Sequence, residues 1–254
     1  MIEVEKAVEN LYGAFSRYPR PVKVECCPCG CTKLDASAQL LAVPLRELCF
    51  ADLTDYCHSA MSTQGSVDNF RYFLPRLFQG ITEEPTDATS EILFGKLSCA
   101  GWKSWPDDEV RAVRKYLQAL WLSGLSSFPI EEHLPAFTEV ETLLASIAQT
   151  GESLEPYLQI WTETTVREAD EHLIQFVTMY GDDFSNGRTL DWAFWEESKA
   201  QAVVLREWLL RPDTLQRIDR ATHLLRSDGF EHLFKPAFVT LQNEAKTRQG
   251  PLRV

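Results

Sequence analysis

The sequence lacks any long apolar run. Asp, Glu, Lys or Arg interrupts every long segment, so no stretch of about 18 apolar residues could cross a membrane. The first residues also lack the basic start and apolar core of a secretory signal, since Glu3 and Glu5 stand there. Glycine (12 residues) and proline (13 residues) are too few for a collagen-like or low-complexity chain. These absences predict a cytoplasmic protein with no membrane partner.

Positive charge is scarce as well. The sequence has 25 Lys and Arg residues against 37 Asp and Glu residues, which leaves a net charge of -12. This sign opposes nonspecific binding to nucleic acid, so we expect no nucleic-acid partner. The hydrophobic content of 44% excludes intrinsic disorder, and 254 residues suffice for a sizeable core. Cysteine occurs in an odd number, 7, and in a reducing cytoplasm we expect free thiols rather than a disulfide framework.

The motifs of common catalytic sites are missing too. There is no Gly-x-Ser-x-Gly elbow, no phosphate-binding glycine loop and no His-Glu-x-x-His pair. Residues 182–187 match a calcium loop only in part, because Phe184 takes a ligand position and Ala193 stands where Glu is required. Glu168 and His172 have the spacing of an acid–base pair on one helix, but such pairs more often stabilise a solvated face. We therefore assign no catalytic residue and no bound cofactor.

Apolar residues at helical spacing are abundant. In the segment 105–121, for example, Val113, Leu117 and Trp121 recur on one face. Pro106 suits the first turn of this predicted helix, where its missing N–H costs nothing. Further helices are expected at 3–16, 35–42, 52–61, 68–79, 90–100, 137–147, 165–180 and 198–209, and Leu215, Ile218 and Leu225 begin one more. Only 22–25, which follows two prolines, suggests extended structure.

Residues near the predicted helix ends support these limits. Thr165 with Glu168 is typical of a capping box, and Gly151 suits the end of the preceding helix. Pro75 either kinks the helix at 68–79 or marks the start of another. The tryptophans expected in the core are Trp102, Trp105, Trp192 and Trp195, and the alternative for them is an exposed binding patch.

The number of helices and the short turns between them predict an all-α fold. We expect stacked antiparallel helical hairpins, arranged as a compact array or as a short solenoid-like stack. There is no repeat of fixed period and no linker rich in Gly, Ser or Pro. Residues 1–254 are therefore expected to form a single all-helical domain, with a soft boundary near 123–129 that we interpret as a loop.

Several short motifs are spread over most of the chain. They are Cys-Pro-Cys at 27–29, Asp-Asn-Phe-Arg-Tyr-Phe-Leu-Pro-Arg at 68–76, Phe-Gly-Lys-Leu at 94–97, Ala-Gly-Trp-Lys-Ser-Trp-Pro at 100–106, Glu-Pro-Tyr-Leu at 155–158 followed by Trp161, and Ala-Phe-Trp at 193–195. Together they resemble a family of uncharacterised bacterial proteins. The resemblance implies a bacterial, mostly helical protein without an established activity, so it assigns no functional residue.

A cluster of cysteines is the sharpest candidate for a chemical site. Its members are Cys26, Cys27, Cys29 and Cys31. Cys26 and Cys29 have the two-residue gap of zinc knuckles, and Cys57 with His58 could supply further ligands of a structural zinc site. The alternative is a tight loop whose thiols pack inward, because cysteines so crowded cannot all reach one ion and Cys57 and His58 point to different helix faces. A redox role for Cys26 and Cys29 lacks the strand–helix–strand unit that such enzymes use.

The charge distribution has one pronounced acidic segment. Between residues 131 and 172 the single basic Lys or Arg side chain is Arg167. The acidic residues there are Glu131, Glu132, Glu139, Glu141, Glu152, Glu155, Glu163, Glu168, Asp170 and Glu171. If the helices expose them on one side, the strip would attract a basic protein and raise its association rate. The predicted partner-binding residues are Glu139, Glu141, Glu168 and Glu171. The alternative is a set of ordinary solvated helix faces.

Two classes of function follow from these patterns. The favoured one is a non-enzymatic acidic module that binds a basic protein, for example as the immunity or inhibitor protein of a nuclease-like toxin. The alternative is an enzyme whose site is assembled from carboxylates at the ends of several helices, which one sequence does not reveal. A deep pocket in which Asp, Glu and His converge would favour the enzyme. A surface without such a pocket would favour the binding module.

Overall fold

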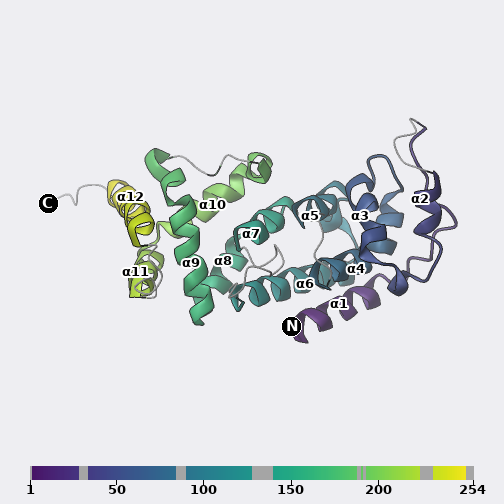
Figure 1. The fold of residues 1–254 in the computed structure, drawn as a ribbon, viewed down its shortest axis with the longest axis horizontal. Coiled ribbons are helices and arrows are strands. Elements are labelled where there is room, and N and C mark those ends of the chain that lie inside the picture. Colours follow the sequence, from purple (N-terminus) through teal and green to yellow (C-terminus); the bar gives the residue numbers. More distant parts are fainter. Residues whose placement is uncertain are drawn as a thin grey trace. The chain divides into compact units, whose positions relative to one another are not determined.

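The computed structural model describes residues 2–28, 34–83, 90–127, 140–187, 190, 193–223 and 231–249 (Figure 1). These residues form twelve α-helices and several short 3-10 helices, and no β-strand occurs among them. The predicted all-α fold is confirmed, whereas the stacking of helical hairpins stays a prediction. No helix within the described segments is long and apolar enough to span a membrane.

The chain divides into two compact units. The first contains the described residues up to Ser123, and the second contains those from Gly124 onward. The division lies inside helix α6 (Asp107–Leu125), at the start of the segment 123–129 for which the sequence suggested a soft boundary. That segment was interpreted as a loop, but its first three residues belong to α6.

Helix α4 is the central element of the first unit. The helices of this unit are α1 (Ile2–Ala14), α2 (Leu34–Gln39), α3 (Phe50–Ser59), α4 (Val67–Glu83), α5 (Ser90–Cys99) and most of α6. Helix α4 packs against α1 and α3. Gly80 permits a close contact with α3, because a Cβ atom there would lie 2.0 Å from the ring of Phe50. Helix α4 continues through Pro75, so this proline does not mark the start of another helix.

The second unit contains a stacked pair of tryptophans. Its helices are α7 (Val140–Gln149), α8 (Glu155–Glu163), α9 (Arg167–Tyr180), α10 (Lys199–Leu209), α11 (Pro212–Ala221) and α12 (Glu231–Gln249). The rings of Trp161 and Trp208 stack with their centroids 5.0 Å apart, which joins α8 to α10. Helix α12 packs against α9 and the short 3-10 helix η4 (Gly181–Gly187). A Cβ atom at Gly181 would lie 2.9 Å from that of Ala237, so the small residue permits this contact.

Most predicted helices are present, with some differences. Helices α8 and α12 were not predicted, and the capping box at Thr165 is wrong because Val166 caps α9 without a side-chain hydrogen bond. Trp102, Trp105 and Trp195 lie in the core as expected, whereas Trp192 lies outside the described residues.

Candidate functional site

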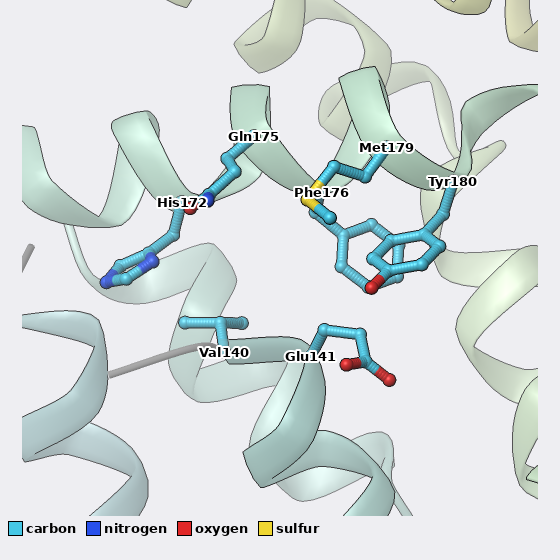
Figure 2. A pocket seen from close by; sticks show the side chains of 7 residues that line it. All are labelled: Val140, Glu141, His172, Gln175, Phe176, Met179 and Tyr180. Atoms are coloured by element: carbon cyan, nitrogen blue, oxygen red, sulfur yellow. The ribbon is translucent and has the colours of Figure 1, made fainter. Parts of the chain in front are cut away.

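A small pocket between α7 and α9 brings titratable side chains of the second unit together (Figure 2). It is lined by Val140, Glu141, His172, Gln175, Phe176, Met179 and Tyr180. The first two residues begin α7, and the other five follow one face of α9 because their spacing of three and four residues matches the helical turn. The pocket has a volume of about 20 Å³, which is room for about one water molecule and not for a substrate.

His172 is held by main-chain carbonyl groups at one end of this pocket. Its Nε2 lies 2.6 Å from the carbonyl oxygen of Ser127 and 3.1 Å from that of Gly124. Carbonyl oxygens only accept, so Nε2 carries the proton and donates to both. Burial lowers the pKa of His172, against the opposing effect of these two hydrogen bonds. The imidazole is therefore a neutral group whose Nε2 proton is engaged with the backbone rather than free for acid–base chemistry with Glu168.

Glu141 points into the second unit rather than toward solvent. Its exposed fraction is 9%, and its Oε1 accepts a hydrogen bond from the indole Nε1 of Trp195 at 3.2 Å. In Figure 2, Val140 lies between this carboxylate and the imidazole of His172. Glu141 was predicted to bind a partner, but its position beside Trp195 removes its carboxylate from any exposed acidic strip.

The other predicted partner-binding residues have different surroundings. Glu139 lies outside the described residues. Glu171 is half-buried and pairs with Arg167 of the same helix at 2.7 Å. Glu168 is half-exposed, and no ion pair is seen for it among the described residues. The partner-binding role therefore stays a prediction for these side chains. The exposed acidic residues of the second unit are not the same residues as the four chosen from the sequence.

Two exposed carboxylates of α8 were missing from that set. Glu155 and Glu163 are exposed at the two ends of the helix, while Tyr157 and Trp161 on its other side are buried. Neither glutamate has an ion-pair partner in the described parts of the chain, and Glu163 accepts one hydrogen bond from Gln159 at 2.7 Å. Recognising α8 as an amphipathic helix would have identified both residues from the sequence.

The three cysteines proposed as zinc ligands, Cys26, Cys29 and Cys57, are not seen together around one metal position among the described residues. Cys57 is fully buried, and burial raises the pKa of its thiol to about 12, which disfavours the thiolate that binds metal. Cys26 is half-buried, and its Sγ lies 2.9 Å from Oγ of Ser37. Cys29 lies outside the described residues.

The described residues contain no group of three or more His, Cys, Asp or Glu side chains that could hold a metal ion. Cys27 is disulfide-bonded, so the prediction of free thiols is wrong for this residue, whereas Cys26, Cys49, Cys57 and Cys99 are free. The structural zinc site stays a prediction.

A larger hollow lies in the first unit, between the segment 22–28 and the region of α2. Its volume is about 760 Å³, and its walls include Val24, Cys26, Ser37 and Leu41. Ser37, which contacts Cys26, belongs to a chain of hydrogen bonds with Gln64 and Ser59. Nε2 of Gln64 donates to Oγ of Ser37 at 2.9 Å, and Oγ of Ser59 donates to Oε1 of Gln64 at 2.8 Å. The charged side chains at the hollow are Lys23 and Glu25, which pair with each other at 2.8 Å.

A cluster of buried charges at the start of α6 has a structural role. The carboxylate of Glu109 is fully buried and accepts the hydroxyl proton of Tyr18 at 2.9 Å. Nε of Arg17 lies 3.4 Å from Oε1, and Nε of Arg71 lies 3.9 Å from Oε2. The guanidinium of Arg71 also lies over the ring of Trp105, 4.5 Å from its centroid. These contacts join the chain after α1 to α4 and α6.

Comparison of the chain with models of protein families, with curated proteins and with solved structures finds no match. The resemblance to a bacterial family stays a prediction.

Proposed function

We propose that the chain is a non-enzymatic acidic module that binds a basic protein through the exposed carboxylates of α8 and α9. The observation that carries the proposal is the set of three glutamates, Glu155, Glu163 and Glu168, which reach solvent on successive helices without an ion-pair partner among the described residues. Such a surface would suit a protein that neutralises a basic toxin, as an immunity or inhibitor protein does, because complementary charges speed association.

Unpaired exposed carboxylates support attraction of a basic partner more strongly than paired ones. The field of Glu171 is largely cancelled by Arg167, and that of Asp170 by Arg217 at 2.7 Å. Glu155 and Glu163 are exposed and Glu168 is half-exposed, and none of the three has an ion-pair partner among the described residues, so they can accelerate association and penalise anionic competitors. Pairing with Lys or Arg of the partner would then replace water at these three positions.

The experiment starts from the partner that co-purifies in stoichiometric amount with the tagged protein from its native host. The association rate with that partner is measured for the wild type and for the triple variant Glu155→Lys, Glu163→Lys and Glu168→Lys at several salt concentrations. We expect the variant to associate at least about tenfold more slowly at low salt, because steering of this kind changes rates by about 10-fold or more. The difference should shrink as salt screens the charges.

A second triple variant controls for net charge and for helix stability. Glu196, Glu197 and Asp213 are also exposed acidic residues of the second unit, and Glu196 and Asp213 lie in the first turns of their helices. Their change to Lys alters the total charge equally and imposes a similar cost on the helix ends. If both triple variants slow association to the same extent, Glu155, Glu163 and Glu168 have no special role and the proposal fails. A stoichiometric partner that binds with no dependence on salt also contradicts it.

A further inference from the structure

The main chain around Cys26 has one edge paired, at residues 25–27, and the other edge open. Cys26 bridges to Gln64 in antiparallel fashion: the amide of Cys27 donates to the carbonyl of Thr63 at 2.8 Å, and the amide of Gly65 donates to the carbonyl of Glu25 at 2.7 Å. In an extended chain, the main-chain groups of successive residues point to alternate edges. The N–H and C=O groups of Val24 and Cys26 therefore face away from Gln64.

These groups have no main-chain partner among the described residues. The Val24 carbonyl accepts one side-chain hydrogen bond, from Sγ of Cys26 at 3.9 Å, and a thiol is a weak donor. Val24 is only 5% exposed, and it is one of the residues that line the hollow of about 760 Å³. Main-chain groups in such a position nearly always find a partner, and an unpaired edge is a template for another strand.

We propose that residues 22–26 pair with the same residues of a second copy of this chain, as an antiparallel ribbon centred on Val24. In this register Val24 faces Val24 of the second copy as a hydrogen-bonded pair, and Lys23 faces Glu25 of the second copy twice, once on each side of the centre. Residues that face each other in this way have Cβ atoms about 4.5–5.5 Å apart, close enough for an ion pair.

Charge complementarity selects a second copy over an unrelated strand. Lys23 and Glu25 carry opposite charges two positions apart and pair with each other at 2.8 Å within one copy, and about three quarters of each side chain is exposed, 76% and 74% respectively. In the ribbon each would exchange this partner for the same residue type of the second copy. An antiparallel copy supplies the matching charge at both positions, whereas a parallel copy does not. Val22, which is 99% exposed, would gain a neighbour on the second copy. The proposal concerns the first unit and does not depend on the acidic residues of α8 and α9.

The test exchanges charges at the two exposed positions. Lys23→Glu and Glu25→Lys each place like charges opposite each other twice, so each variant alone should dimerise about tenfold more weakly than the wild type in sedimentation equilibrium. The double variant restores both opposite pairs and should dimerise like the wild type. An equal mixture of the two single variants should form a mixed dimer, because one copy then carries two Glu and the other two Lys. Both side chains are exposed, so the variants should keep the fold.

Hydrogen exchange supplies an independent measurement on the same samples. The amide protons of Val24 and Cys26 should exchange slowly in concentrated wild-type protein and quickly in Lys23→Glu. A wild type that stays monomeric at high concentration overturns the proposal. So does a dimer whose stability is the same in all four proteins, or one in which the amides of Val24 and Cys26 are not protected.

Discussion

Arg217 of α11 closes the C-terminal end of α8. Its guanidinium donates to the main-chain carbonyl of Trp161, to that of Thr162 at 3.3 Å and to that of Thr164 at 2.7 Å. Its Nε also donates to Oδ1 of Asp170 at 2.7 Å. The last carbonyl groups of a helix have no partner within the helix, and a positive charge near them stabilises the negative end of the helix dipole. The change Arg217→Met keeps an apolar stem and removes every donor at once.

The expected loss follows from burial. The Arg217 side chain is 13% exposed and that of Asp170 is 30% exposed. Loss of one member of a buried ion pair lowers the free energy of unfolding by about 3–5 kcal/mol. Because Asp170 stays partly hydrated, we expect the lower end, about 3 kcal/mol, for Arg217→Met. Arg217→Lys keeps the charge but lacks the planar fork that reaches several acceptors, so it should lose about half as much.

The assay is the free energy of opening of the second unit, measured by hydrogen exchange at the amides of α8 and α10. A local measurement is needed because two units can unfold separately. Arg211→Met is the matched control: Arg211 is exposed and has no ion pair with a described residue, so its change should cost less than about 0.5 kcal/mol. If Arg217→Met falls within about 1 kcal/mol of this control, the closing role of Arg217 is refuted.

Two further predictions concern a buried imidazole and a close helix contact. The pKa of folded His172 lies below its unfolded value of about 6.5, so on acidification the unfolded chain takes up the proton first and stability falls by up to about 1.4 kcal/mol per pH unit. His172→Gln removes this pH dependence. In urea unfolding, the free energy of unfolding of the wild type should therefore fall relative to that of the variant below about pH 6.5. Parallel curves of unfolding free energy against pH would contradict this. Gly80→Ala should lower the melting temperature, because its Cβ would lie 2.0 Å from the ring of Phe50, at a cost of about 1–3 kcal/mol. Gly13→Ala, with no atom within 4 Å, should raise the melting temperature instead, and shifts of equal sign would refute the contact.

Helix positions were predictable because each amphipathic helix carries its own apolar spacing. In α6, the buried residues Val113, Leu117 and Trp121 recur every four residues, and Pro106 stands just before the first turn. Local spacing of this kind needs no knowledge of the neighbouring helices. It therefore predicts the class of the fold and most helix limits to within a few residues.

The two missed helices have weaker local signals. Helix α8 has only nine residues, so its apolar side chains complete little more than two turns. Helix α12 contains Pro236, which usually ends a helix and here lies inside it. Its buried residues Phe234, Ala237 and Leu241 do have helical spacing across this proline.

The surroundings of the candidate residues could not be predicted, because they depend on contacts between distant parts of the sequence. Glu141 accepts its hydrogen bond from Trp195, and His172 donates to the carbonyls of Gly124 and Ser127, 48 and 45 residues away. Counting charges along the chain treats Glu141 and Glu168 alike. Tertiary packing places the first in the interior and leaves the second half-exposed.

The electric field of the acidic segment is therefore smaller than its composition indicates. Glu141 is buried, and Asp170 and Glu171 are paired with Arg217 and Arg167, so none of these carboxylates acts at full strength on a partner. The unpaired glutamates of α8 and α9 act over about 8 Å at physiological salt, the distance at which ions screen exposed charges. A basic partner would thus be guided mainly in the last step of its approach. For this reason, association should respond to the positions of individual carboxylates more than to the net charge of the protein.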